Sequence, residues 1–306
     1  MRLSLIIDGN YILYKSVFTL KKYNSIYGGL YDMLDKEIKG FSNLYSFEDV
    51  YLVSDKKSSW RKNLYKDYKA KRTKDGNIDW EYVFEEYDNI KHDLDLKVLE
   101  KDNIEGDDLI YFISKENEKK GISNLIISND FDLNQIIYGY SNPLFFNLMI
   151  NDNSRNPHMF VPKNYKVILS AMATKTVNIF DDNDSTHSIY RFLKNLHNTY
   201  TPKLTDNKKD LIIKILSGDA SDNIKGVYPR IGEKTAEKIY NKFLIAKEKI
   251  GKYNLYDLLS EMVIEQTKAT QEDFNLIREN IIFNNSLINL KHIPENIVKK
   301  IKQLEI

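Results

Sequence analysis

The chain has 306 residues, of which 42% are hydrophobic and 29% are charged, and its formal net charge is +1. This composition is typical of a globular protein with one large or two medium domains. No window approaches the roughly 18 apolar residues of a membrane span, and Asp8 comes too early for a secretory leader. Cysteine is absent and the five histidines form no HxxxH pattern, which excludes disulfides, thiolate sites and a cysteine nucleophile and argues against a histidine zinc site. We therefore expect a cytoplasmic protein.

Three short apolar runs end in aspartate. LSLIIDG ends at Asp8, DVYLVSD ends at Asp55, and SNLIISNDFD reaches Asp130 and Asp132. Such short runs of Leu, Ile and Val are typical of strands that are buried on both faces. The helical stretches between them predict βαβ units and therefore a parallel sheet. Because ligands bind outside the carboxyl ends of parallel strands, we expect a site at these acids.

Two charge blocks of opposite sign follow Asp55. Residues 56–74 carry nine basic side chains and one acid, whereas residues 75–108 carry thirteen acids and three lysines. Solvated helix faces are the ordinary explanation of such blocks. A basic block directly beside an acidic site is also typical of a protein that binds phosphates.

The peptide KDYKAKR, residues 66–72, holds the candidates for phosphate contact. Helical spacing would place Lys69 and Arg72 on one face, with Tyr68 nearby. Lys66, Lys69 and Arg72 would neutralise phosphates, and Tyr68 would stack on a terminal base. Packing inside the protein is the alternative for Tyr68.

A further acidic cluster is EGDD, residues 105–108. Glu105, Asp107 and Asp108 open an amphipathic helix that we expect to stop near Gly121. Acids in a first helical turn interact favourably with the helix dipole, and this is the alternative explanation for Asp107. Three acids within four residues exceed what a dipole requires.

The C-terminal third is predicted to be mostly helical from about Asn207, after a mixture of loops and two helical stretches in residues 142–205. We therefore place a domain boundary near residue 205. Within LSGDASDNIKGVYPRIGEKTAEKI, the pair Asp219 and Asp222 precedes a short hairpin and a helix.

The hairpin has the features of a phosphate site. Backbone amides near Gly232, with Lys234 and Thr235 at the helix start, can bind a duplex phosphate without reading bases. The expected specificity is therefore for shape, a duplex beside a free 5′ end. A solvated surface lysine is the alternative for Lys234.

Nine carboxylates stand out, and together they predict bound cations, because clustered carboxylates repel one another unless cations are present. All-oxygen ligand sets suit Mg²⁺ or Mn²⁺, and two such ions can clamp the attacking and leaving oxygens of a phosphodiester. The nine are Asp8, Asp55, Glu105, Asp107, Asp108, Asp130, Asp132, Asp219 and Asp222.

With these residues in view, the chain resembles the 5′ nuclease family, which includes flap endonucleases, bacteriophage 5′–3′ exonucleases, phage RNase H and the 5′–3′ exonuclease domain of bacterial DNA polymerase I. The resemblance covers almost the whole chain. Five ordered pieces carry it: IIDGN, Asp55 with YKAKR, EGDD, SNDFDLNQ, and GDASDNIKGV…IGEKTA.

The resemblance implies a PIN-like parallel sheet with flanking helices and a helical arch at about residues 56–100. It implies a catalytic domain over residues 1–205 and a helical domain over residues 206–306 with a helix–three-turn–helix motif. Residues 142–203 resemble an insert, to which no function is assigned.

The resemblance also implies two metal sets and two basic catalytic residues. Lys69 and Arg72 match the family's YKxxR segment, which contacts the scissile phosphate at the base of the arch, and a K⁺ ion is implied at the hairpin. The first metal set is Asp8, Asp55, Glu105, Asp107 and Asp108; the second is Asp130, Asp132, Asp219 and Asp222, some of them through water.

Three departures from the family pattern are visible. Gly106 replaces the usual alanine, Lys225 replaces a common proline, and the hairpin GVYPRIG is one residue longer than usual. The longer hairpin puts the K⁺ site in question. All nine acids are present, so an active enzyme is expected.

The function that the resemblance implies is removal of primers or flaps by a monomeric, two-metal phosphodiesterase of bacterial or bacteriophage replication. Its substrates would be DNA with a 5′ flap or free 5′ end and RNA–DNA hybrids, and a single-strand-binding protein or a polymerase would be a reasonable partner. The alternatives are a catalytically weak homologue that binds branched DNA and a PIN-type ribonuclease of single-stranded RNA. A third alternative, in which every acid is a cap or surface charge, must explain three strands that close on aspartate.

Overall fold

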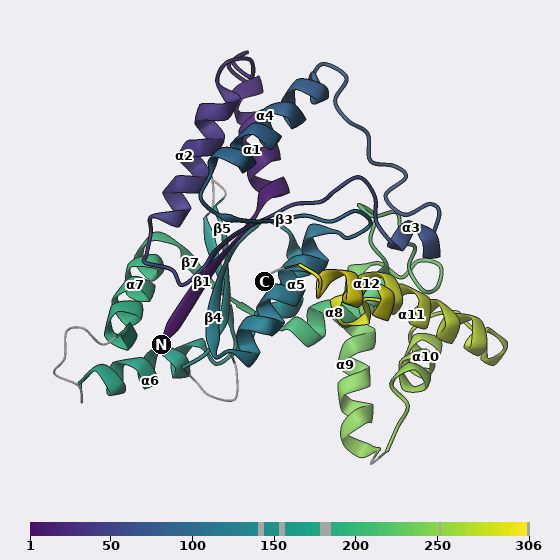
Figure 1. Ribbon diagram of the computed structural model, residues 1–306. Coiled ribbons are helices and arrows are strands. Elements are labelled where there is room, and N and C mark those ends of the chain that lie inside the picture. The colour runs from purple at the N-terminus through teal and green to yellow at the C-terminus, as the bar shows by residue number, and fades with distance from the viewer. Residues whose placement is uncertain (140–143, 153–156, 178–184, 251, 305–306) are drawn as a thin grey trace. The chain divides into compact units, whose positions relative to one another are not determined.

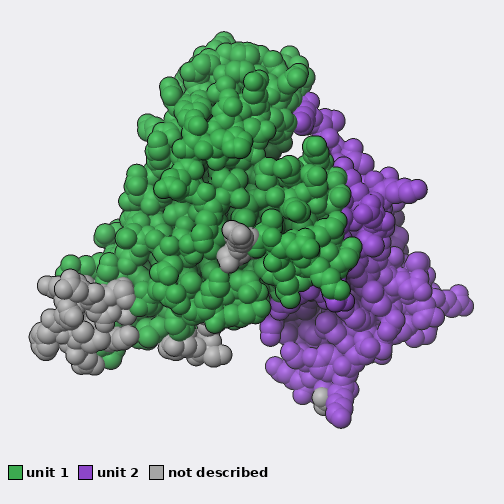
Figure 2. All heavy atoms as spheres, viewed as in Figure 1, with its two compact units in different colours: residues 1–58, 75–206, 296–306 green, residues 59–74, 207–295 purple. Residues whose placement is uncertain are grey.

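The computed structural model describes residues 1–139, 144–152, 157–177, 185–250 and 252–304. The predicted insert lies partly outside the described residues. The chain forms two compact units (Figure 2). Unit 1 comprises residues 1–58, 75–206 and 296–306, and unit 2 comprises residues 59–74 and 207–295. Among the helices described, none has the length and apolar character of a membrane span.

Unit 1 is built on a seven-stranded sheet (Figure 1). All neighbouring strands are parallel except β5 and β6, so the predicted α/β fold with a largely parallel sheet is confirmed. In spatial order the strands are β3 (Lys97–Leu99), β2 (Val50–Val53), β1 (Arg2–Asp8), β4 (Ile122–Ile127), β5 (Asn147–Asn151), β6 (His158–Pro162) and β7 (Thr201–Thr205).

The central strands are the three that the apolar runs predict. Every residue of β4 is buried, and five consecutive residues of β1, from Leu3 to Ile7, are buried. The sequence did not predict the other four strands. β3 has only three residues and lies inside the segment expected to form the arch. β5, β6 and the start of β7 extend the sheet with residues assigned to the insert.

Helices of unit 1 flank this sheet (Figure 1). α2 packs against both α1 and α4, α5 lies against β4 and β1, and α6 packs against α7. The helices are α1 (Gly9–Lys21), α2 (Leu30–Ser42), α4 (Trp80–Asp93), α5 (Gly106–Lys119), the 3₁₀ helix η1 (Phe131–Ile136), α6 (Tyr165–Val177), α7 (Ser185–Thr199) and α12 (Glu295–Ile301), whose first residue belongs to unit 2.

Unit 2 contains helices joined by turns and loops, and its described residues are mostly helical from Asn207 onward, as the sequence predicts. Its core joins side chains of α8 to α11, including Leu216, Ile239 and Ile277. The helices are α3 (Arg61–Leu64), α8 (Asn207–Ser217), α9 (Glu233–Lys249), α10 (Leu255–Gln266), η2 (Gln271–Asp273), α11 (Phe274–Ile288) and η3 (Leu290–His292).

Residues 59–74 are the unexpected part of unit 2, because they come from the segment expected to form the arch. Tyr68 belongs to the unit 2 core, and Arg61 donates through Nε to the carbonyl of Leu287 at 2.7 Å. The helical spacing expected for residues 66–72 is wrong. Residues 66–71 form turns, and Lys69 has a left-handed backbone with φ of 57°.

Candidate active site

Asp8, Asp55 and Asp130 lie at the same edge of the unit 1 sheet because their strands are parallel neighbours. Asp8 is in register with Val53 of β2, and Ile7 with Ile127 of β4. Asp55 comes two residues after the end of β2, and Asp130 comes three residues after the end of β4. We call the carboxylates gathered here in unit 1 the acidic edge: Asp8, Asp55, Glu105, Asp107, Asp108, Asp130 and Asp132.

Ser128 links Asp8 to Asp130. Its hydroxyl donates to Asp8 Oδ2 at 2.6 Å and accepts from the Asp130 amide at 3.0 Å. Asp8 Oδ1 accepts from the Tyr11 amide at 3.0 Å, which makes Asp8 the N-cap of α1. Asp130 Oδ1 in turn accepts from the Asp132 amide at 2.7 Å and caps η1. Local capping thus fixes both carboxylates where their strands end.

Asp55 connects the strand ends to the first turn of α5. Its Oδ1 accepts from the Gly106 amide at 2.6 Å. Glu105 is the N-cap of α5, and its amide donates to Asp108 Oδ2 at 3.4 Å as part of a capping box. Capping therefore explains part of the acid cluster that the sequence singled out. Asp107, in the same turn, is half-buried.

The pKa of Asp8 is raised to about 6. Burial is the main cause, the hydrogen bonds from Ser128 and Tyr11 oppose it, and the nearby carboxylates of Asp130 and Asp55 add to it. A carboxylate in this position is stabilised by a proton or by a cation. The acidic edge therefore favours the binding of positive charge.

Support behind Asp8 comes from residues that the sequence analysis did not single out. A Cβ at Gly9 would lie 1.9 Å from the Tyr87 hydroxyl and 2.6 Å from Ser54 Oγ, so only glycine fits beside this buried pair. The two hydroxyls are hydrogen-bonded at 2.6 Å. The glycine of IIDGN was a signal of this close approach, but its partners are distant in sequence and had no signal. Ser128 was visible only as a polar residue at a strand end.

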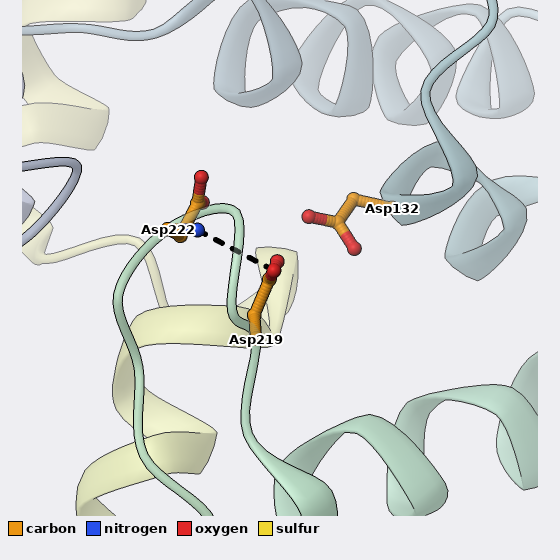
Figure 3. A group of neighbouring side chains, drawn as sticks. All are labelled: Asp132, Asp219 and Asp222. Carbon is orange, nitrogen blue, oxygen red and sulfur yellow. Dashed lines mark hydrogen bonds between the residues drawn. The ribbon is translucent and has the colours of Figure 1, made fainter. Parts of the chain in front are cut away.

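In unit 2, Asp219 and Asp222 occupy the loop after α8, joined by a hydrogen bond from the Asp222 amide to Asp219 Oδ1 at 3.4 Å (Figure 3). Ser221 Oγ also donates to Asp219 Oδ1, at 2.7 Å, and the Lys214 ammonium lies 2.7 Å from Asp219 Oδ2. Burial acts to raise the pKa of Asp219, but the Lys214 ion pair and the Ser221 hydrogen bonds outweigh it and lower that pKa.

Asp222 is buried and accepts hydrogen bonds from two residues of the basic segment, Tyr68 and Arg72. The Tyr68 hydroxyl donates to Oδ2 at 2.9 Å, and Arg72 Nη2 donates to Oδ1 at 2.6 Å. Tyr68 is only 3% exposed, which favours packing over base stacking for this side chain. Lys69 places its ammonium 5.0 Å from the centre of the Tyr68 ring, and Lys66 is exposed.

The predicted hairpin follows this loop. Gly218 turns the chain with φ of 75°, and Asp219 and Ile224 exchange two backbone hydrogen bonds. Gly232 is the N-cap of α9 and accepts from the Thr235 amide at 3.0 Å. Gly232 and Lys234 are exposed and Thr235 is half-buried. The helix–hairpin–helix pattern read from the sequence is therefore present.

The sequence model of the family described as "5'-3' exonuclease, N-terminal resolvase-like domain" matches residues 3–166, more than half of the chain. The chain belongs to this 5′-3′ exonuclease family. The match covers the acidic edge in full. The predicted 5′ nuclease, a phosphodiester hydrolase, is thereby confirmed as the class of protein.

Relatives named 5′-3′ exonuclease align along most of this chain. The protein of Buchnera aphidicola subsp. Schizaphis graminum is 24% identical over 306 residues, which are 97% of this chain and 89% of that protein. The protein of Mycoplasmopsis pulmonis is 26% identical over 309 residues, 99% of this chain and 85% of that protein. The similarity thus extends through unit 2, beyond the residues that the family model matches.

Solved structures of the family share the fold. The bacteriophage T5 D15 protein co-crystallised with metal ions is 17% identical with a TM-score of 0.58, and the match covers 99% of this chain and 97% of that one. A T5 D15 flap endonuclease in a pseudo-enzyme–product complex with DNA and metal ions gives the same identity and coverage with a TM-score of 0.60. This likeness supports the fold of both units.

Proposed function

We propose that this member of the family is a divalent-metal-dependent 5′ nuclease that hydrolyses phosphodiesters at or near the 5′ end of a nucleic-acid strand. The observation that carries the proposal is the gathering of Asp8, Asp55 and Asp130 at one sheet edge, with the pKa of Asp8 raised to about 6. A carboxylate that is buried and has other carboxylates nearby costs stability when it is ionised, and a protein retains such a group where a ligand compensates.

The residues of the acidic edge fit a hard divalent cation. All the side chains offer carboxylate oxygens, the donors that Mg²⁺ and Mn²⁺ prefer. A bound cation of this type supplies a water of lowered pKa and stabilises the departing oxygen. We assign Asp8, Asp55, Glu105, Asp107 and Asp108 to one metal set, as the family resemblance implies, and Asp130, Asp132, Asp219 and Asp222 to a second.

The protein's own groups prepare the acidic edge for this task. Ser128 and the Tyr11 amide hold the two oxygens of Asp8, and the Gly106 amide holds one oxygen of Asp55. Donors that are fixed before the ligand arrives spare the site a reorganisation. Lys69 and Arg72 are proposed to contact the scissile phosphate, as their match to YKxxR implies.

Unit 2 is proposed to bind the duplex. Gly232, Lys234 and Thr235 at the start of α9, with Lys66, present exposed or half-buried donors to phosphate oxygens. The neighbour in complex with DNA supports a nucleic-acid substrate. The proposed substrate is a duplex with a 5′ flap or free 5′ end, or an RNA–DNA hybrid. We further propose a K⁺ ion at the hairpin and a monomeric enzyme. A single-strand-binding protein or a polymerase is the proposed protein partner.

A labelled substrate tests the proposal. A 5′-flap duplex carrying a label at the flap end is incubated with Mg²⁺, Mn²⁺ or EDTA and with the wild type, Asp130→Ala or Asp95→Ala. Asp95 is exposed in the loop between α4 and β3 and serves as the matched control, because its removal takes a carboxylate from outside the acidic edge.

Metal-dependent cleavage near the branch that Asp130→Ala abolishes and Asp95→Ala retains is the expected result. Product lengths would separate exonuclease from endonuclease action. Tight binding without cleavage would instead favour the branched-DNA-binding homologue, and preferential cleavage of single-stranded RNA would favour the PIN-type ribonuclease.

A further inference from the structure

Both carboxylate oxygens of Asp222 are engaged by the basic segment that precedes them by about 150 residues. Arg72 holds Oδ1 at 2.6 Å and Tyr68 holds Oδ2 at 2.9 Å. The Lys69 amide donates to the carbonyl oxygen of Asp222 at 2.9 Å as well. Asp222 thus accepts three hydrogen bonds from residues that lie within one five-residue stretch, 68–72.

Neighbouring contacts extend this docking. The Tyr65 hydroxyl donates to the carbonyl oxygen of Asn223 at 3.1 Å, and Asn223 Nδ2 donates to the carbonyl oxygen of Asp67 at 3.0 Å. The left-handed backbone of Lys69 and of Asn223 lets the two turns face each other. We call this set of contacts between residues 65–72 and residues 219–223 the docked turn.

The two side chains that hold the Asp222 carboxylate differ in exposure. The Tyr68 side chain is buried, whereas 53% of the Arg72 side chain is exposed. A buried hydroxyl keeps its acceptor, because a buried donor without a hydrogen-bond partner is costly. An exposed guanidinium can exchange acceptors at little cost, and phosphate and carboxylate both match its planar donors.

We propose that Arg72 passes from Asp222 to a substrate phosphate, releasing Oδ1 for a cation, while Tyr68 stays in place as the positioning residue of Asp222. The proposal deepens the proposed function, on which it rests. In the docked turn the Arg72 guanidinium supplies the positive charge beside Asp222 Oδ1. When substrate binds, Arg72 moves to the phosphate, and Asp222 Oδ1 is then available to a cation.

Direct Mn²⁺ binding without DNA tests the exchange by a readout other than cleavage. Free Mn²⁺ is followed by electron paramagnetic resonance for the wild type, Arg72→Gln and Lys71→Gln. Lys71 is exposed and adjacent, so its substitution removes the same charge and controls for the general field. We expect Arg72→Gln to raise Mn²⁺ affinity about three- to fivefold over Lys71→Gln, the range of a partly exposed ion pair.

The gain must also depend on Asp222. Adding Asp222→Asn to Arg72→Gln should abolish it, because the released oxygen is then no longer a carboxylate. Equal Mn²⁺ affinity for Arg72→Gln and Lys71→Gln, or a gain that persists with Asp222→Asn, would overturn the exchange. Neither outcome depends on cleavage, so a failure here is distinct from a failure to cleave the flap duplex.

Two substitutions of Tyr68 separate positioning from base stacking. Tyr68→Phe keeps the ring and removes the hydroxyl that holds Oδ2. Positioning predicts that Tyr68→Phe raises the Mn²⁺ concentration needed for half-maximal cleavage several-fold and leaves DNA affinity in EDTA unchanged. Stacking predicts that Tyr68→Phe behaves as the wild type, while Tyr68→Leu alone loses DNA affinity, and that pattern would overturn the role assigned to Tyr68.

Discussion

Arg72 donates to Asp222 at 2.6 Å, so a side chain assigned to phosphate contact and a side chain assigned to metal binding are ion-paired with each other inside unit 2. Arg72 thereby occupies one oxygen of the buried Asp222 carboxylate. Its strength is limited, because the Arg72 side chain is half exposed. A contact of this kind holds the docked turn together and is still weak enough to open.

A double-mutant cycle measures the pair. Asp222→Asn and Arg72→Gln, alone and together, should show a coupling free energy of unfolding of about 1 kcal/mol, and high salt should reduce it. Urea unfolding followed by circular dichroism gives the four free energies. The cycle of Lys71→Gln with Asp222→Asn is the control, and a coupling there as large as for Arg72 would show that the effect is a general field.

The raised pKa of Asp8 predicts how the stability of the metal-free protein depends on pH. The pKa of Asp8 is about 6 in the folded protein and 3.8 for an ordinary aspartate, as in the unfolded chain, so the folded state binds more protons between these values. Stability should therefore rise as pH falls through 6, and the gain should be complete below about 4. The rise attributable to Asp8 is at most about 3 kcal/mol.

Urea unfolding in EDTA between pH 7 and pH 4.5 checks this expectation. Asp8→Asn removes the titrating group, so the difference between wild type and variant isolates its share from that of other acids. Mg²⁺ should counteract the dependence, because cation and proton compete for the same carboxylate. A difference that stays constant with pH would mean that Asp8 is not protonated in this window.

The central strands could be predicted because their signal is local. The runs that form β1, β2 and β4 are short, apolar and closed by aspartate, and parallel pairing then places Asp8 beside Asp55 and Asp130. The edge strands had no such signal. β3 has three residues, and its pairing with β2 depends on a register that no local pattern encodes.

The turn at residues 66–71 could not be predicted because contacts distant in sequence override its helical spacing. Its backbone is set by hydrogen bonds to Asp222 and Asn223, about 150 residues away. Tyr68 illustrates the same limit. An aromatic residue within a basic peptide is consistent with both stacking and packing, and only the partner of its hydroxyl decides between them.

Lys69 offers a test of whether its side chain acts in the reaction. Its φ of 57° is costly for a residue with a Cβ, by about 1 kcal/mol. Lys69→Gly should therefore be at least as stable as Lys69→Ala, although both lack the ammonium. Both variants should lose flap cleavage by about a hundredfold or more if the ammonium stabilises the transition state. Cleavage rates beside thermal melts decide the matter, and an active Lys69→Ala would remove Lys69 from the catalytic residues.

Gly218 gives the strongest prediction for the loop that presents Asp219. Its φ is 75°, and a Cβ would lie 2.4 Å from the carbonyl oxygen of Ile224, so backbone must move to admit a side chain. Gly28 has a φ of 77° with open space around it, which makes Gly28→Ala the matched control for the backbone conformation alone. Gly28→Ala should cost about 1 kcal/mol, whereas Gly218→Ala should cost roughly 3 kcal/mol or more. Urea unfolding measures both, and equal losses would show that the loop has room for a methyl group and that the paired backbone of Asp219 and Ile224 yields easily.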